Sequence, residues 1–188
     1  MLLHRALVLA TVFIAVVTSL DGQTVASTIV VLVRHAEKAT SPEHDPGLTE
    51  GGRARADALA EALRDARVDA VITSHYERTR KTAEPIAAAR HLTPVLIRAG
   101  TDTSAHVREV AAAVRSQAAG GLVLVVGHTN TIPPIIAALG GPQLPDIRDG
   151  EYGRLFTLVL PPGGTPRLIQ STYGARDPAE PCGRTMIR

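Results

Sequence analysis

Apolar and polar residues follow one another in blocks along this chain. The run from Thr28 to Val33 is β-branched or aliphatic at nearly every position and ends abruptly at Arg34 and His35. An uninterrupted apolar run of this length is typical of a strand buried on both faces, as in a parallel or mixed α/β sheet. The run 122–126 has the same character. The pattern therefore predicts two central strands, each followed by residues capable of chemistry.

Helical spacing of apolar residues predicts three longer helices between these strands. Thr49 is the expected N-cap of the first helix, and the pattern Ser74-x-x-Glu77 is a capping box that would open the second. The third helix follows a loop and cap region at 100–104 and ends before Gly120-Gly121. The first two helices are expected at about 50–66 and 75–89, and the third, with its apolar stripe beginning at Val107, extends to about residue 119.

Four shorter strands and a short helix complete the pattern. Strands are expected at 68–73, 94–97, 155–160 and 167–171, and the short helix at 133–139. A turn-rich segment, 161–166, joins the last two strands. Strands that alternate with helices predict an α/β protein. We expect one domain, residues 27–188, folded as a three-layer α/β/α sandwich with a mostly parallel central sheet.

The first residues have the pattern of a targeting segment. His4 and Arg5 precede an apolar run at 6–17, followed by small and polar residues. This run is shorter than the roughly 20 residues that span a bilayer, and it has the length of a signal-peptide core. We expect residues 1–26 to be a signal peptide, cut after Ser19 or Ala26, and the protein to be periplasmic or secreted without a stable membrane span. An uncleaved N-terminal anchor is the alternative.

Composition excludes several kinds of partner. The net charge is only +2, and the chain has five aromatic residues and no Trp, so the basic and aromatic surface of a nucleic-acid-binding protein is missing. Cys182 is the single cysteine, which rules out an internal disulfide. The histidines are scattered and no cysteine pair exists, so no metal site and no cofactor are expected. The sequence does not indicate an oligomeric state.

Three of the predicted strands end in a similar way. Arg34 and His35 follow the first, Gly127 and His128 follow another, and Arg78 lies one turn into the helix after a third. Parallel strands would bring these ends to one edge of the sheet, where ligands bind in such folds. Two unit positive charges about 4 Å apart repel by about 4 kcal/mol at an effective dielectric of 20, unless an anion joins them. A phosphoryl group suits such a site, because arginine binds its oxygens bidentately and a helix N-terminus adds N–H donors.

At this point the sequence resembles the histidine phosphatase superfamily, also called phosphoglycerate-mutase-like. The matching blocks span about residues 28–140 in the family's order and spacing. The resemblance is greatest to the short bacterial members, which lack the large inserted lid of the mutases. The blocks are Arg34-His35-Ala36-Glu37-Lys38, Leu48-Thr49 with Gly52, Thr73-Ser74 with Arg78-Thr79 and Thr82-Ala83, and Val126-Gly127-His128-Thr129-Asn130-Thr131.

The resemblance implies a role for each matching residue. His35 would be the nucleophile that accepts phosphate on a ring nitrogen, and Arg34, Arg78 and His128 would hold the phosphoryl oxygens. Thr129 and Lys38 are further candidate substrate contacts, although ordinary surface solvation is the alternative for Lys38. The implied activity is metal-independent hydrolysis of a phosphorylated small molecule or a phosphoprotein through a phosphohistidine intermediate.

The proton donor for the leaving group is less obvious. Family members supply a carboxylate, usually Glu, between the second Arg and the second His. That interval here offers Glu84, Asp102 and Glu109. Asp102 is the preferred candidate because it follows a strand in a loop, and N-capping of the next helix is its alternative role.

Two other functions fit the same blocks. A phosphate-binding module that has lost its acid would keep the pocket without catalysis. A phosphomutase would need a lid that shields phosphohistidine from water, and the chain has no long insertion to form one.

Overall fold

The computed structural model describes residues 26–117 and 120–177, so the predicted signal peptide, apart from Ala26, and Cys182 lie outside the described residues. No helix in the described part is long and apolar enough to cross a bilayer. The described elements, in chain order, are β1 (Thr28–Arg34), α1 (Glu50–Ala62), β2 (Val68–Ser74), α2 (Glu77–Ala89), β3 (Val95–Ile97), α3 (Thr103–Arg115), β4 (Leu122–Gly127), α4 (Ile132–Ala138), β5 (Arg154–Leu160) and β6 (Arg167–Thr172).

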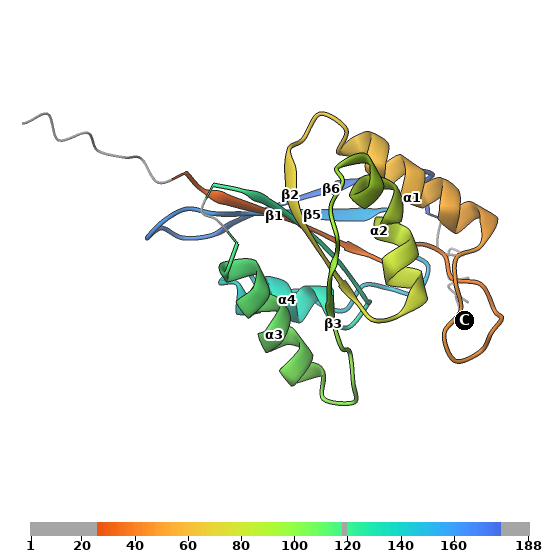
Figure 1. Cartoon of the computed structure of the whole chain (residues 1–188). Coiled ribbons are helices and arrows are strands. Elements are labelled where there is room, and N and C mark those ends of the chain that lie inside the picture. The colour runs from red at the N-terminus through yellow and green to blue at the C-terminus, as the bar shows by residue number, and fades with distance from the viewer. Residues whose placement is uncertain (1–25, 118–119, 178–188) are drawn as a thin grey trace, which may run out of the picture.

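One sheet of six strands forms the middle layer, in the order β3-β2-β4-β1-β5-β6 (Figure 1). The first four strands in this order run parallel to one another, whereas β5 pairs antiparallel with β1 and β6 antiparallel with β5. Residues 30–33 of β1 are at most 3% exposed, as their unbroken apolar run predicts. The expected α/β sandwich with a mostly parallel sheet is confirmed.

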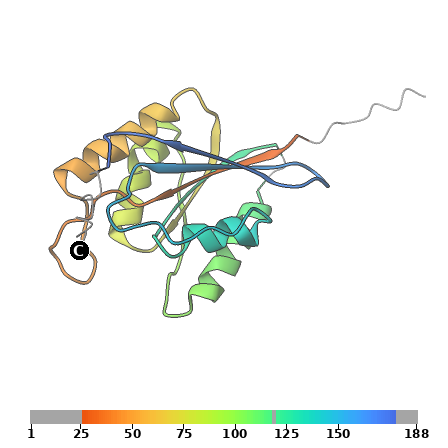
Figure 2. The same ribbon diagram turned by 180° about the vertical axis from the view of Figure 1, so that it is seen from behind.

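The path of the chain decides which face each helix covers. After β1, the chain adds β2 two positions away in the sheet and then β3 beyond it. It then returns across the sheet, a reversal in the order of the strands, to place β4 between β2 and β1. Because parallel crossovers are right-handed, this reversal places α3 opposite α1 and α2. Figures 1 and 2 show α1 and α2 on one face, α3 and α4 on the other, and the β5–β6 hairpin at one side of the sheet.

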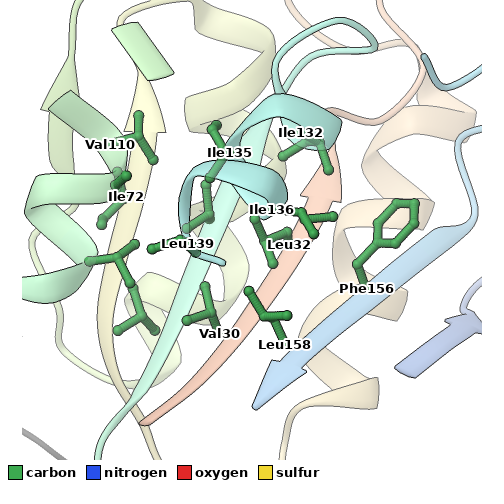
Figure 3. Close-up of a cluster of buried hydrophobic side chains, with 14 of the residues drawn as sticks. Val30, Leu32, Ile72, Val110, Ile132, Ile135, Ile136, Leu139, Phe156 and Leu158 are labelled. Atoms are coloured by element: carbon green, nitrogen blue, oxygen red, sulfur yellow. The ribbon is translucent and has the colours of Figure 1, made fainter. Parts of the chain in front are cut away.

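Alternate residues of β1 therefore belong to two separate cores. Val30 and Leu32 pack with the apolar residues of α3 and α4, among them Ile132 and Ile136, and with Phe156 of β5 (Figure 3). The intervening residues, Val31 and Val33, pack with the apolar residues of α1 and α2. Burial on both faces holds β1 and its carboxyl end rigidly.

The two predicted helix caps have different outcomes. Thr49 caps α1 as expected, since its Oγ1 accepts a hydrogen bond from Gly52 N at 2.9 Å. The capping box predicted for α2 is wrong, because α2 begins at Glu77 after Tyr76 and has no side-chain cap from Ser74. Instead, the Oδ1 of Asp45, from the loop after β1, accepts from Glu77 N at 2.8 Å.

Two helices end before their predicted limits. α1 ends at Ala62 rather than near residue 66, and α3 (Thr103–Arg115) ends before the expected limit near residue 119. The apolar stripe marked the buried face of α3 correctly, but it did not mark the polar first turn that Asp102 caps.

Candidate active site

The carboxyl ends of β1, β4 and β2 lie side by side at one edge of the sheet. Arg34 pairs with Gly127, and Thr73 pairs with Val126 one residue earlier in register. His35 continues this alignment, because its N–H donates to Gly127 O at 2.9 Å. The residues that follow the three strands are therefore neighbours in space, as the sequence predicts.

A pocket of about 340 Å³ opens at this edge. It brings together the predicted Arg34, His35, Arg78 and His128, but not Asp102, and the loops after β1, β2, β3 and β4 contribute to it. Its lining consists of Arg34, His35, Lys38, Tyr76, Arg78, Ala99, Gly100, Thr103, His106, His128, Thr129, Asn130, Thr131 and Asp149.

The His35 ring is fixed in one tautomer. Its Nδ1 lies 2.8 Å from the carbonyl oxygen of Ala36, and a carbonyl only accepts, so Nδ1 carries the proton and Nε2 keeps its lone pair. The pKa of His35 is lowered to about 4, chiefly by burial and also by the nearby charges of Arg34 and Arg78, against the opposing effect of the Ala36 bond. At neutral pH this side chain is a neutral imidazole with a nucleophilic nitrogen.

The second imidazole lies against the first. The ring centroids of His35 and His128 are 5.4 Å apart, in an edge-to-face arrangement. His128 Nε2 lies 3.0 Å from Ser74 Oγ, which in turn lies 2.9 Å from Thr79 Oγ1. Burial, followed by the charges of His35 and Arg78, lowers the pKa of His128 to about 3. Both rings are therefore uncharged at neutral pH.

A hydroxyl chain assigns the proton of His128. The Thr79 hydroxyl donates to the carbonyl of Tyr76 at 2.8 Å, so the Ser74 hydroxyl donates to Thr79 Oγ1 and accepts from His128 Nε2–H. Ser74 is thereby committed to the site, which explains why it does not cap α2.

Backbone carbonyls and an aromatic ring hold the guanidinium of Arg34. Its Nη1 donates to Arg148 O at 2.9 Å and Asp149 O at 2.6 Å, and its Cζ lies 4.0 Å from the centroid of the Tyr152 ring. The residue is only 5% exposed, yet Nε is buried without a hydrogen-bond partner. A buried N–H without a partner is costly.

Arg78 is held in a similar way. Its Cζ lies 4.1 Å from the centroid of the Tyr76 ring, and its Nε is also buried without a partner. Burial lowers the pKa of both Arg34 and Arg78, which indicates that positive charge is costly at this site. A ligand with two or more negative oxygens would relieve that cost.

The remaining candidates fall into two groups. Lys38 and Thr129 line the pocket. Asp102 does not lie on the lining, although its neighbour Thr103 does, and its Oδ1 caps α3 by accepting from Ala105 N at 3.0 Å. Glu84 forms an exposed ion pair with Lys81, and Glu109 is exposed on α3. An acid role for Asp102 stays a prediction.

Sequence reasoning missed three residues that contact this site. Asp149 lines the pocket and its carbonyl accepts from Arg34, Tyr152 stacks on Arg34, and His106 lines the pocket at 3% exposure. His106 alone left a signal in the sequence, because it lies four residues before Val110 on the apolar stripe of α3. The other two follow a segment with no periodicity.

Comparisons with known proteins agree with this architecture. The family model described as the histidine phosphatase superfamily (branch 1) matches residues 30–100. No curated protein matches the sequence.

Several solved structures share the fold. A protein histidine phosphatase SixA in complex with tungstate has a TM-score of 0.60 and 18% identity, covering 77% of this chain and 96% of its own. A putative phosphohistidine phosphatase SixA from Nakamurella multipartitia has a TM-score of 0.57 and 26% identity, covering 80% and 98%. A mycobacterial glucosyl-3-phosphoglycerate phosphatase has a TM-score of 0.57 and 20% identity, covering 78% and 98%.

The chain thus has the α/β fold of solved phosphatases, with a pocket at the carboxyl ends of its parallel strands. More narrowly, the chain resembles the histidine phosphatase superfamily both in its sequence and in its fold, so the resemblance inferred from the motifs is confirmed.

Proposed function

We propose that this protein is an exported, metal-independent phosphatase that forms a phosphohistidine intermediate on His35. One observation carries the proposal. His35 presents a neutral Nε2 in the same pocket as Arg34 and Arg78, whose buried Nε groups have no partner. A nucleophile and two cationic donors in one pocket are what transfer of a phosphoryl group requires.

In the first step, the lone pair of His35 Nε2 attacks phosphorus and the bond to the leaving group breaks. The electron pair of that bond goes to the leaving atom. Arg34 and Arg78 donate to the remaining phosphoryl oxygens, where loss of one donor costs about 3 to 4 kcal/mol of transition-state stabilisation. His128, whose Nε2–H is given to Ser74, joins them as a donor once its ring binds a second proton. The Ala36 carbonyl keeps Nδ1–H in place while the ring gains positive charge.

In the second step, water attacks the phosphohistidine. The P–N bond breaks, the electron pair of that bond returns to Nε2, and inorganic phosphate is released. The water proton leaves with the phosphate or to solvent, so His35 regains the tautomer that it had before the reaction. No lid has to close for this step, because the nucleophile already lies in a pocket open to water.

The substrate class follows from the proton that the leaving group needs. Asp102 remains our candidate donor, but it caps α3 outside the pocket lining. Leaving groups that depart without strong acid assistance therefore suit the site best. We propose proteins phosphorylated on histidine ahead of alkyl phosphate monoesters, a group that includes phosphoserine and phosphothreonine. One structural neighbour is named a protein histidine phosphatase and another a putative phosphohistidine phosphatase.

Export belongs to the same proposal. Its support is the charged start and the short apolar run of residues 1–26, with residues 27–188 as the mature domain. N-terminal sequencing of the protein purified from its native host tests the cleavage after Ser19 or Ala26.

Mass spectrometry of rapidly quenched enzyme tests the nucleophile. After exposure to a panel of phosphohistidine peptide, aryl phosphate and sugar phosphates, we expect an acid-labile phosphoryl group on His35. The His35→Ala variant should lose turnover by at least about 10³-fold while keeping its melting temperature, because His35 is the covalent nucleophile.

Other results would support the competing functions. Turnover that survives in His35→Ala contradicts the assignment of the nucleophile. Binding of inorganic phosphate without any adduct would indicate a phosphate-binding module. Transfer of the phosphoryl group to a second alcohol in preference to water would indicate a mutase.

A further inference from the structure

We propose that Arg55, which does not line the pocket, is a positioning residue that fixes both the nucleophile and the Arg34 side of the phosphate site. It acts through two carboxylates, Glu37 and Asp177. This inference rests on the proposed function, because it concerns the same pocket.

Arg55 is a buried cation whose donors point at three different segments. It lies on α1, is 4% exposed, and its Nε and Nη2 donate to the Glu37 carboxylate at 2.7–3.0 Å. Its Nη1 donates to Ala175 O at 3.0 Å and lies near Tyr173 O at 3.3 Å. The Asp177 carboxylate is 3.3 Å from Nη2. The guanidinium joins residues that are far apart in the chain.

The first carboxylate leads to the nucleophile. The peptide group between Ala36 and Glu37 supplies the carbonyl that accepts from His35 Nδ1. On one side, Ala36 N–H donates to Thr82 Oγ1 at 2.9 Å, and on the other the Glu37 side chain is clamped by Arg55. With both flanks held, the carbonyl keeps one direction and therefore selects one tautomer of His35.

The second carboxylate leads to Arg34. Asp177 accepts from the backbone N–H groups of Tyr152 and Gly153 at 2.9–3.0 Å. The Tyr152 ring lies against the Arg34 guanidinium, and the residues just before it supply the carbonyls that accept from Arg34. Arg55 and Asp177 together thus fix the segment on which Arg34 rests.

One buried cation holds the walls of the pocket from two directions, and a misplacement of about 1 Å at a reacting group costs on the order of 10²-fold in rate. We therefore expect Arg55 to affect geometry at His35 and affinity at Arg34 without contacting the substrate.

The test compares Arg55→Met and Arg55→Lys with a matched control, Arg90→Met. Arg90 also donates to several backbone carbonyls, those of Leu63, Arg64 and Ala66 after α1, but does not line the pocket. With an aryl phosphate as substrate, we expect Arg55→Met to lower kcat by about tenfold to a hundredfold and to weaken binding of inorganic phosphate. Arg55→Lys should recover part of the loss, and Arg90→Met should lower the melting temperature with wild-type kcat.

Two measurements do not depend on turnover. Nitrogen-15 NMR should show His35 as the Nδ1–H tautomer in the wild type and a mixture of tautomers in Arg55→Met. Calorimetry with inorganic phosphate measures the phosphate affinity, which reports on Arg34 separately from His35. Glu37→Gln should change the NMR signals of His35 and leave the phosphate affinity nearly unchanged. Asp177→Ala should weaken phosphate binding and leave the His35 signals nearly unchanged. These two variants test the inference even if Arg55→Met fails to fold.

The outcomes separate the two proposals. If Arg55→Met loses melting temperature but keeps kcat, the His35 tautomer and phosphate affinity, Arg55 is only structural and the inference is wrong. If the wild type turns over none of the substrates, the proposed function fails, while the NMR and phosphate measurements still decide the role of Arg55.

Discussion

Each residue of the phosphate pocket that the sequence predicted lies at a fixed distance from the end of a strand. Arg34, His35 and His128 come directly after buried apolar runs, and Arg78 lies in the first turn of the helix that follows another. Such positions follow from periodicity and sheet geometry alone. Tyr152 and Asp149 come from the segment between α4 and β5, whose contacts are long-range and leave no local pattern.

Burial of the two imidazoles predicts an unusual pH profile. The neutral form of His35 is the nucleophile, and its pKa is lowered to about 4. Lowering the pKa extends the active form toward acid, so the acid limb of kcat/KM should lie near pH 4 instead of about 6.5. The measurement is a pH–rate profile with an aryl phosphate, corrected for the ionisation of the substrate. A limb at about 6.5 would mean that His35 is solvated in solution.

The same shift has a consequence for stability. Between about pH 4 and 6.5 the unfolded chain binds more protons than the folded one, so the free energy of unfolding should fall as pH falls through that window. At about 1.4 kcal/mol per pKa unit, His35 accounts for roughly 3 kcal/mol of this loss. Chemical denaturation of the wild type and of His35→Ala at pH 7 and pH 4.5 isolates the contribution.

Asp102 is a candidate for two roles, the N-cap of α3 and the proton donor to the leaving group. As the N-cap of α3, it accepts from Ala105 N, so Asp102→Ala should lower the free energy of unfolding by about 1 kcal/mol, whereas Asp102→Asn should keep the cap. Denaturant titration measures this difference. The Asn variant also tests the proton donor: a selective loss of turnover for alkyl over aryl phosphates would assign that role to Asp102.

Among the elements, the contact between α1 and the loop after β1 depends on one glycine. A Cβ at Gly52 would lie 2.3 Å from the carbonyl oxygen of Glu37, a backbone atom that has no room to move. Gly52→Ala should therefore displace the nucleophile loop, lower the free energy of unfolding by at least about 1–3 kcal/mol and weaken phosphate binding. Thermal melts and phosphate calorimetry would check both effects.

The preceding glycine is the matched control for that substitution. A Cβ at Gly51 would meet only Thr49 Oγ1, at 3.8 Å. Because alanine is favoured over glycine within a helix, Gly51→Ala should raise the free energy of unfolding by about 0.5–1 kcal/mol. An equal loss of stability in Gly52→Ala and Gly51→Ala would show that α1 itself, and not its contact with Glu37, is sensitive to the substitution.

Element types were predictable from apolar spacing, whereas some element ends were not. The local pattern Ser74-x-x-Glu77 indicated a cap, yet Ser74 instead bonds His128, and Asp45 takes its place at the start of α2. The competing partner lies 54 residues away. A tertiary contact of this kind overrides local preference, so no reading of neighbouring residues could have found it.

For the whole molecule, the sequence predicted the layers but not the order of the strands. Alternating elements indicate helices on both faces of a sheet, but nothing in β5 or β6 shows that they extend the β1 side of the sheet in the antiparallel direction. That arrangement matters for the site. Because β5 lies beside β1, the segment just before it reaches the end of β1, where its carbonyls hold Arg34.

The stacking of aromatic rings on the two arginines has a practical consequence. The chain has no tryptophan and three tyrosines, and two of these, Tyr76 and Tyr152, lie against Arg78 and Arg34. Two of the three rings that give the unlabelled protein its ultraviolet emission thus lie against arginines of the pocket. An anion that draws the guanidiniums off these rings would change that emission, which gives a label-free optical assay for screening ligands.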